Sequence, residues 1–295
     1  MIILDGKALF EKIKIDLSLE VKTLIKLNKK VPHLSAILVG DDPASQTYIN
    51  AKVNACNEVG FRSSVFQYPD DVSEKILLKK IQEINKSKDI DGLIVQLPLP
   101  KIINSNIITH SISPQKDVDG FHPINIGRMV LGLNCFLPAT PFGIISLLDE
   151  YKIETAGKNC LVIGRSHIVG TPISILLSRN TKMGNATVTL AHSRTSNLND
   201  LTQNADIIIL ALGVPAFLKS SMVKKDVIIV DVGIHRVPSD KTKSGYKLIG
   251  DVDFDDVANK TSYITPVPGG VGPMTIASLL KNTLYSAKKM IYSHT

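Results

Sequence analysis

The sequence has no tryptophan, few aromatic residues and only three cysteines, and each shortage excludes a class of protein. Aromatic residues make up 5% of the 295 residues, and the lysines are dispersed. Proteins that bind single strands of nucleic acid combine basic grooves with aromatic rings, so we expect no nucleic-acid partner. Cys56, Cys135 and Cys160 lie far apart, without CxxC or Cys/His spacing. We therefore expect no metal site, and a reducing cytoplasm as the compartment.

Long apolar runs are also missing. A membrane-spanning helix needs about 18 or more consecutive apolar residues, and no segment reaches that length. The first residues, Met1 to Lys7, do not combine a basic stretch with an apolar stretch as a secretory signal does. We expect a cytoplasmic protein without a membrane partner.

The chain carries an excess of positive charge. Its formal net charge is +7 and its isoelectric point is about 9.1. A basic surface attracts small polyanions. The alternative is a general enrichment in lysine without a functional meaning, and the charge alone leaves both interpretations open.

Apolar segments alternate between helical and strand-like patterns along the chain. Before residue 98 we expect helices at 5–28, 43–59 and 73–85 and strands at 34–39, 64–67 and 92–97. After residue 140 we expect helices at 141–151, 171–178 and 273–291 and strands at 159–163, 187–190, 206–210 and 227–230. This alternation predicts parallel sheets covered by helices.

The predicted fold class is therefore α/β, with two α/β domains and a cleft between them. The second domain is expected to be a Rossmann-type, doubly wound parallel sheet. The expected boundaries are 1–137 plus 274–295 for the first domain and 138–273 for the second, because the last helix can return to the first domain.

The segment Gly164 to Pro172 lies between an expected strand and an expected helix. In a doubly wound sheet, the pyrophosphate of a dinucleotide binds at this place, against the helix N-terminus. The motif departs from GxGxxG because Ser166 takes the second glycine position. We predict that Gly164, Arg165 and Ser166 bind the cofactor; an ordinary turn between strand and helix is the alternative.

The residues after the next strand indicate which dinucleotide binds. An NAD enzyme usually has an acidic residue there, which accepts from the ribose 2′-hydroxyl, but this chain has Ser193 and Arg194 and no acid. Arg165 and Arg194 can meet a 2′-phosphate, and Ser193 can donate to it. We therefore predict NADP as the cofactor and add Ile234 to the expected cofactor contacts. The alternative is that both arginines are solvated surface charges.

Four polar residues of the first domain are candidates for a substrate site. Tyr48 and Lys52 are four residues apart, so they share one helix face. Gln96 ends an apolar strand, and ligands of open α/β sheets bind beyond strand ends. Asp119 lies in a polar turn, where its carboxylate can face paired N–H donors or only its own backbone. Taken one at a time, these residues are also compatible with ordinary surface and turn positions.

Three prolines and three glycines occur between Tyr263 and Thr275. Proline fixes φ and glycine permits positive φ, so the segment sets a defined backbone path. Glycine also lets a ligand approach the backbone closely.

Taken together, these motifs resemble the bifunctional methylenetetrahydrofolate dehydrogenase/methenyltetrahydrofolate cyclohydrolase family. The motifs that carry the resemblance occur in the family's order: Gly40 to Tyr48 with Lys52, Gln96 to Pro100, Lys116 to Gly120, Gly164 to Pro172 and Pro266 to Thr275. They cover nearly the whole chain. Ala139 stands where many relatives have cysteine, which puts no expected role in doubt.

The resemblance implies two activities and assigns residues to them. Methylenetetrahydrofolate would give a hydride to NADP, and the methenyl product would be hydrolysed to 10-formyltetrahydrofolate. Lys52 resembles the catalytic lysine and Gln96 its hydrogen-bond partner. Tyr48 resembles the residue that stacks on the folate, and Asp119 the anchor of the pterin ring. The turn at Pro268, Gly269 and Gly270 resembles a wall of the folate cleft, and the family implies a homodimer.

Three other functions remain possible from the sequence. One is a dehydrogenase without cyclohydrolase activity, and the second is a folate- or NADP-binding module without turnover. The set of Tyr48, Lys52, Gln96 and Asp119 argues against both. The third, a general NADP dehydrogenase for an acidic metabolite, leaves residues 40–120 unexplained.

Overall fold

The computed structural model describes residues 1–242 and 245–292, and contacts divide the chain into two compact units. Unit 1 comprises Met1–Phe10 with Thr140–Thr275, and unit 2 comprises Glu11–Ala139 with Ile276–Thr295. The three limits between the units fall inside helices α1 (Gly6–Lys26), α6 (Ala139–Glu150) and α10 (Val271–Ala287). The predicted α/β class is confirmed.

Unit 1 is built on a six-stranded sheet in the order β1-β11-β8-β7-β5-β6. All of its strand pairs are parallel, as predicted. Its strands are β1 (Ile2–Ile3), β5 (Asn159–Ile163), β6 (Thr187–Ala191), β7 (Ile207–Leu210), β8 (Val227–Asp231) and β11 (Thr261–Ile264). Strand β6 pairs on one side of β5 and β7 on the other, so the order reverses between β5 and β7. Dinucleotides bind at such a reversal.

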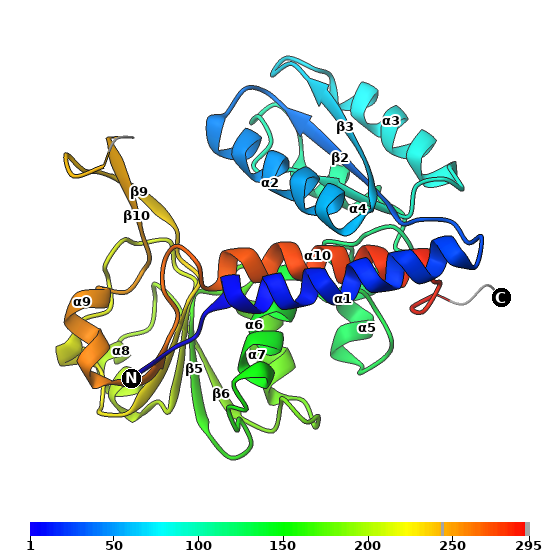
Figure 1. Cartoon of the computed structure of the whole chain (residues 1–295). Coiled ribbons are helices and arrows are strands. Elements are labelled where there is room, and N and C mark those ends of the chain that lie inside the picture. Colours follow the sequence, from blue (N-terminus) through cyan, green and yellow to red (C-terminus); the bar gives the residue numbers. More distant parts are fainter. Residues whose placement is uncertain (243–244, 293–295) are drawn as a thin grey trace. The chain divides into compact units, whose positions relative to one another are not determined.

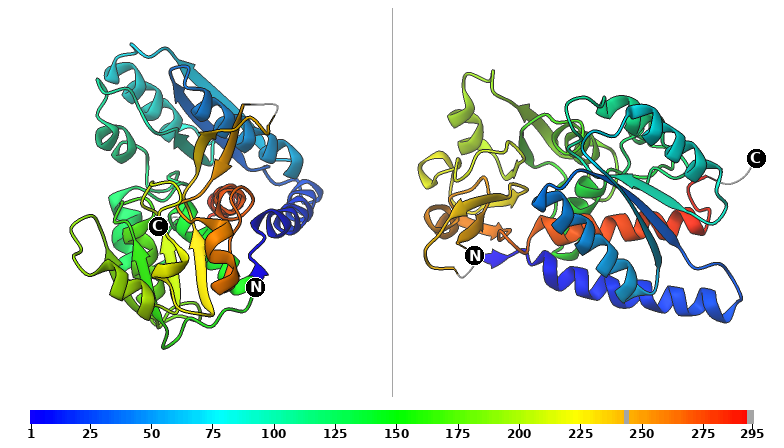
Figure 2. Two further views of the ribbon diagram at one scale, coloured as in Figure 1. Left: turned by 90° about the vertical axis from the view of Figure 1, so that its left-hand side faces the viewer. Right: turned by 90° about the horizontal axis from the view of Figure 1, so that it is seen from above.

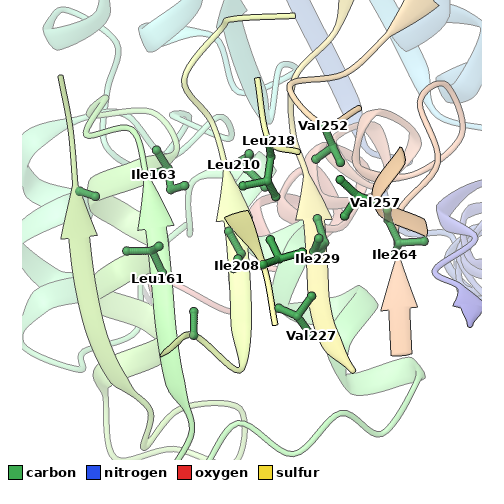
Figure 3. Packing of buried hydrophobic residues seen from close by; sticks show 13 residues of the cluster. Leu161, Ile163, Ile208, Leu210, Leu218, Val227, Ile229, Val252, Val257 and Ile264 are labelled. Carbon is green, nitrogen blue, oxygen red and sulfur yellow. The ribbon is translucent and has the colours of Figure 1, made fainter. Parts of the chain in front are cut away.

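Alternate residues of the central strands of unit 1 enter one apolar core (Figure 3). Leu161 and Ile163 of β5 and Ile208 and Leu210 of β7 point to the same face, as the two-residue period of a strand requires. Helices α8 (Leu198–Asn204) and α9 (Phe254–Val257) contribute apolar residues to this face. The core therefore fixes the strand register and, with it, the positions of the loops that follow the strands.

Two further helices of unit 1 lie across the sheet from α8 and α9 (Figure 1). They are α6 (Ala139–Glu150) and α7 (Gly170–Ser178), and α7 packs on β5 and β6. The antiparallel hairpin of β9 (His235–Pro238) and β10 (Tyr246–Ile249) projects from the six-stranded sheet (Figure 2). Two 3₁₀ turns, Ser220–Met222 and Ala258–Lys260, complete the elements of this unit.

Unit 2 contains a parallel three-stranded sheet in the order β3-β2-β4. The strands are β2 (His33–Val39), β3 (Arg62–Tyr68) and β4 (Gly92–Val95), and helices α2 (Pro43–Val59) and α3 (Glu74–Lys86) lie on opposite faces (Figure 1). Two short helices follow, α4 (Ser105–His110) and α5 (Pro123–Val130). Here the strand order reverses between β2 and β4.

Local signals set both ends of helix α2. Asp42 caps the N-terminus by accepting a hydrogen bond from the Ser45 amide at 2.8 Å, and Pro43 occupies the first turn. Gly60 ends the helix with a φ of 81°, a left-handed conformation that glycine adopts at low cost. These signals fix which residues of the helix face the end of β2.

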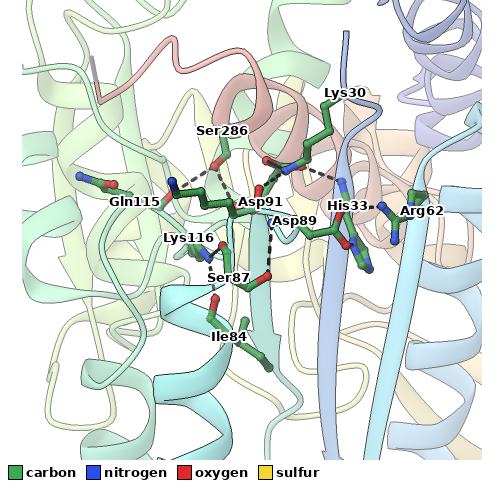
Figure 4. A network of polar contacts seen from close by, with 11 residues as sticks. Lys30, His33, Arg62, Ile84, Ser87, Asp89, Asp91, Gln115, Lys116 and Ser286 are labelled. Atoms are coloured by element: carbon green, nitrogen blue, oxygen red, sulfur yellow. Dashed lines mark hydrogen bonds and ion pairs between the residues drawn. The ribbon is translucent and has the colours of Figure 1, made fainter. Parts of the chain in front are cut away.

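A polar network ties together the segments that enter the sheet of unit 2 (Figure 4). Asp91 accepts from Lys30 at 2.7 Å and from the His33 amide at 2.9 Å. Lys116 donates to the carbonyls of Ile84 and Ser87 at the end of α3, and burial lowers the pKa of its ammonium group. The network fixes the start of the segment that continues from Lys116 toward Asp119.

The last described residues of the chain also bind this segment. Asn282 donates to the carbonyls of Val118 at 2.8 Å and Leu137 at 3.0 Å. Tyr292 donates to the buried amide oxygen of Asn125 at 2.8 Å. Residues at the C-terminus therefore complete a loop that lies much earlier in the sequence.

The structure differs from the sequence-based expectation at the N-terminus. The first domain was expected to include residue 1, but Ile2 and Ile3 pair with Tyr263 and Ile264 of β11 in unit 1. Strand β11 was not expected either; its last two residues, Tyr263 and Ile264, begin the Pro/Gly-rich segment. None of the helices in the described part of the chain combines the length and apolar content that crossing a membrane requires.

Replacing Ser35 by alanine is expected to stabilise the protein. Ser35 is fully buried in β2, and its hydroxyl has no hydrogen-bond partner among the described residues. An unsatisfied buried polar group costs about 1–3 kcal/mol, so Ser35→Ala should raise the free energy of unfolding by about 1 kcal/mol in urea titrations. The matched control is Ser64→Ala, which removes a 2.8 Å hydrogen bond to His33 and should lower the free energy of unfolding. A loss of stability in both variants would contradict this account.

Candidate active site

Lys52 and Gln96 meet at the carboxyl edge of the sheet of unit 2. Lys52 projects from α2, which follows β2, and its Nζ donates to Oε1 of Gln96 at 3.1 Å. Gln96 comes directly after β4, where its own amide donates to the Ile37 carbonyl at 2.9 Å. The side-chain amide of Gln96 donates to the Leu97 carbonyl at 2.8 Å, which fixes its oxygen toward the lysine. The reversal of strand order therefore brings together two of the residues singled out in the sequence.

Tyr48 lies one helical turn before Lys52 on the same face of α2. Its side chain is 39% exposed, so a large part of the ring is accessible. An exposed ring beside an amine and an amide can stack on a planar ligand that those groups hydrogen-bond.

Asp119 is the third polar group at this edge. Burial raises the pKa of its carboxyl, the positive charge of Lys52 lowers it, and the negative charge of Asp117 raises it. A parallel bridge joins Leu93 of β4 to Asp117, so Asp119, two residues further on, lies beside the end of β4. A carboxylate at this position can accept two parallel N–H donors from one ligand edge.

Asp117 organises the turn that carries Asp119. Its buried carboxylate accepts from the amides of Phe121 at 3.1 Å and His122 at 2.8 Å and from the side chain of Asn125 at 2.8 Å. Burial raises the pKa of Asp117, and these donors oppose that shift. The sequence analysis noted this turn but not the role of its first acid.

The second candidate site lies in unit 1, where the loops after β5 and β7 meet. Gly164 has a φ of 111°, and a Cβ on it would stand 2.1 Å from the Ala211 carbonyl oxygen. Gly170 is equally restricted, because its Cβ would stand 1.9 Å from the Gly164 carbonyl oxygen. Only glycine fits at both positions. This close backbone packing at the start of α7 is the arrangement that the dinucleotide motif requires.

The predicted phosphate-binding residues lie on two adjacent loops. The Gly164 amide donates to the Ala191 carbonyl at 2.9 Å, which joins the loop after β5 to the turn after β6. Arg165 and Ser166 on the first loop and Ser193 and Arg194 on the second are all exposed. Ser166 Oγ accepts from the Val169 amide at 3.2 Å. Exposed cations and hydroxyls beside a helix N-terminus fit a phosphorylated ribose, so the residues present suit NADP.

Pro268, Gly269 and Gly270 form a tight turn in unit 1. Gly269 has a φ of 108°, and its carbonyl accepts from the Lys7 amide at 2.9 Å. A Cβ on Gly6 would stand 1.8 Å from the Gly270 carbonyl oxygen, so the turn packs directly on the start of α1. The turn belongs to a different unit from Lys52, and its grouping with the substrate site stays a prediction.

A pair of buried acids at the carboxyl edge of unit 1 was not expected from the sequence. Asp231 ends β8 and Asp251 follows β10, and both side chains accept backbone N–H groups. Burial, with a contribution from the charge of Asp251, raises the pKa of Asp231 to about 6, against the lowering effect of its N–H donors. The sequence signal that could have revealed Asp231 was an acid at the end of the apolar strand Val227–Asp231. Ile234, expected to contact the cofactor, lies two residues before Arg236 on this edge and is 45% exposed.

Within the described part of the chain, no group of three or more His, Cys, Asp or Glu residues is arranged to bind a metal ion. Among the described residues, the three cysteines are buried and outside any disulfide, and burial raises the pKa of Cys56 and Cys160 to about 12. Thiols with such a pKa are poor nucleophiles at neutral pH.

Sequence comparisons match both halves of the chain to one family. Residues 4–119 match the model described as tetrahydrofolate dehydrogenase/cyclohydrolase, catalytic domain, and residues 138–291 match the NAD(P)-binding domain of the same family. A bifunctional protein FolD of Cytophaga hutchinsonii is 58% identical over 287 residues, which are 97% of this chain and 99% of the relative. Another, from Bacteroides thetaiotaomicron, is 54% identical over 99% of this chain and 100% of the relative.

Solved structures show the same similarity. The bifunctional FolD enzyme of Campylobacter jejuni has a TM-score of 0.92 and 48% identity, over 98% of this chain and 99% of that chain. The Trypanosoma brucei dehydrogenase-cyclohydrolase, solved with NADP and an inhibitor, has a TM-score of 0.93 and 34% identity, over 99% of both chains.

Gly164→Ala is expected to lower stability more than the same change at Gly157. Both glycines have positive φ, 111° and 71°, but a Cβ at Gly157 meets nothing within 4 Å. Left-handed backbone costs alanine about 1–2 kcal/mol. The clash with Ala211 should bring the total at Gly164 to roughly 3 kcal/mol or more. Urea titration of both variants measures the difference, and equal losses would show that the approach to Ala211 is not restrictive.

Proposed function

Because this chain belongs to the tetrahydrofolate dehydrogenase/cyclohydrolase family, we propose that it carries out both reactions of that family's name. It oxidises 5,10-methylenetetrahydrofolate to the methenyl form with NADP and hydrolyses the methenyl form to 10-formyltetrahydrofolate. The observation that carries the proposal is the 3.1 Å hydrogen bond between Lys52 and Gln96 at a sheet edge that the segment of Asp119 also reaches through the bridge between Leu93 and Asp117.

The oxidation requires the protein to align the substrate with the cofactor more than it requires acid–base groups. Bound NADP supplies the hydride acceptor, while the nitrogens of the substrate stabilise the cation that forms. The residues of this chain hold the two partners at reacting distance, which is the main contribution an enzyme makes to such a transfer. Gly164, Arg165 and Ser166, with Ser193, Arg194 and Ile234, are the residues proposed to bind the cofactor.

The hydrolysis needs proton transfers, and Lys52 is the residue proposed to make them. Its Nζ donates one hydrogen bond to Gln96, which orients the amine and leaves its remaining positions for the reacting water or the folate. Tyr48 is proposed to stack on the folate, and Asp119 to accept N–H donors from the pterin edge. Pro268, Gly269 and Gly270 are proposed to line the same substrate site.

The expected domain limits, compartment and oligomeric state are parts of the same proposal. The catalytic domain is proposed to comprise residues 1–137 with 274–295, apart from the first ten residues, which belong to unit 1, and the cofactor domain residues 138–273. An odd number of widely separated cysteines suits a reducing cytoplasm. The homodimer is proposed by analogy with the family.

An absorbance assay tests both activities. Purified protein is mixed with methylenetetrahydrofolate and either NADP or NAD, and the formation and decay of the methenyl product are followed against an enzyme-free control. NADP-dependent formation with accelerated decay is expected. Formation without accelerated decay would leave a dehydrogenase only, and no turnover with either cofactor would leave a binding protein.

Replacing Lys52 by methionine is expected to abolish most hydrolysis. The variant keeps a side chain of similar length but loses the proton-transfer group, so methenyl hydrolysis should fall about 10²–10⁴-fold. Folate affinity, measured by fluorescence titration, should change only a few-fold. Lys22→Met, at an exposed site on α1, is the matched control. Unchanged hydrolysis in the Lys52 variant would remove this residue from the mechanism.

Replacing Arg194 by serine is expected to weaken the preference for NADP. Loss of one charge-assisted bond to the 2′-phosphate should raise the KM for NADP about 10-fold, while the KM for NAD, which lacks that phosphate, should stay nearly constant. Lys225→Ser removes an exposed cation just before β8, away from the proposed cofactor edge, as a control. An equal change in both KM values would show that Arg194 does not contact the 2′-phosphate.

A further inference from the structure

Asp251 lies buried between the loops that follow β7 and β10. Its Oδ2 accepts from the amides of Leu212 at 2.9 Å and Gly213 at 3.1 Å, and its Oδ1 accepts from the Val214 amide at 3.0 Å. The side chain is fully buried. One carboxylate therefore fixes three consecutive amides of the loop after β7.

His235 completes the hydrogen bonds of this carboxylate. Its Nε2 lies 2.7 Å from Oδ1 of Asp251, and its ring is 19% exposed. A carboxylate that already accepts three N–H groups can only accept again, so the ring donates from Nε2. The interaction ties the start of β9 to the loop after β7.

Asp231 holds the backbone on which this pair is built. Its Oδ1 accepts from the amides of Gly233 at 2.9 Å and Asp251 at 3.0 Å, and its Oδ2 accepts from the Val252 amide at 2.9 Å. A Cβ on Gly233 would stand 2.4 Å from Oδ1 of Asp251. The carboxylates of Asp231 and Asp251 thus hold three loop segments in fixed positions.

The locked loops present apolar side chains at the edge where a dinucleotide is proposed to bind. Val214 and Ile234 are each 45% exposed, and Ile168 in the loop after β5 is 40% exposed. These three loops follow β5, β7 and β8, which are neighbours in the sheet. Exposed aliphatic residues on a rigid backbone suit the flat face of an aromatic ring.

We infer that Asp251 and His235 form a positioning pair that holds Val214 and Ile234 against the cofactor's ring. This inference rests on the proposed NADP-dependent function and deepens it. It assigns a role in placing the cofactor to residues that do not contact the cofactor's phosphates. His235 acts through Asp251 and is a positioning residue, not a catalytic one.

The test measures cofactor affinity in His235→Ala and His235→Gln. The alanine variant loses the donor to Asp251, so the dissociation constant for NADPH, from fluorescence titration, and the KM for NADP should both rise about 10-fold. The glutamine variant can donate an N–H from a similar position and should recover most of the affinity. Methenyl hydrolysis, proposed to depend on Lys52, should stay within about two-fold in both variants.

A second substitution and a control separate positioning from general destabilisation. Asp251→Asn places an NH₂ group against backbone donors and should weaken NADPH binding at least as much as His235→Ala. If the Asp251→Asn variant does not fold, the comparison of His235→Ala with His235→Gln tests the positioning role alone. Val237→Thr, on the same strand and of the same size, should leave NADPH binding unchanged. Unchanged NADPH binding in His235→Ala, or equal weakening in the alanine and glutamine variants, overturns the inference.

Failure of the proposed function is a separate outcome. An unmodified chain that binds NADPH but does not oxidise methylenetetrahydrofolate disproves the activity, while the affinities of the His235 variants still decide the positioning role. An unmodified chain that binds no NADPH overturns both.

Discussion

Parallel strand pairing is the constraint on which the rest of this structure depends. In a parallel sheet all strands end at one edge. Where the connections after two neighbouring strands lead to opposite sides of the sheet, a crevice forms beyond the ends of those strands. This happens between β2 and β4 in one unit and between β5 and β7 in the other. Lys52 and Gln96 lie at the first reversal, and Gly164 and Ala211 lie at the second. The candidate sites are consequences of strand order.

Much of this arrangement could be predicted because its signals are local. Helix α2 has the bounds expected from Pro43 and Val59, and β5 has the expected limits of 159 and 163. Each rests on a proline, a glycine or an apolar run that acts within a few residues. The hydrogen bond between Lys52 and Gln96 was implied by the family resemblance, and of the two residues only Gln96 was expected at the end of a strand.

The elements that escaped prediction depend on distant partners. Strand β1 has two residues and exists only because β11, from the other end of the sequence, pairs with it. Asp251 and His235 belong to no sequence motif. Their role depends on three loop amides that the fold brings to the Asp251 carboxylate. Short strands and buried acids lack a periodic signal, so spacing alone does not reveal them.

The bonds from Asn282 and Tyr292 to the region around Asp119 have a consequence for biosynthesis. A ribosome delivers residues in order, and these two side chains emerge long after the residues to which they bond. The segment around Val118 and Leu137 lacks the Asn282 hydrogen bonds until then, and Asn125 lacks its bond from Tyr292. A nascent chain can thus form the sheet of unit 2 early, yet the turn that carries Asp119 gains its last hydrogen bonds only after residues 282–292 have been synthesised.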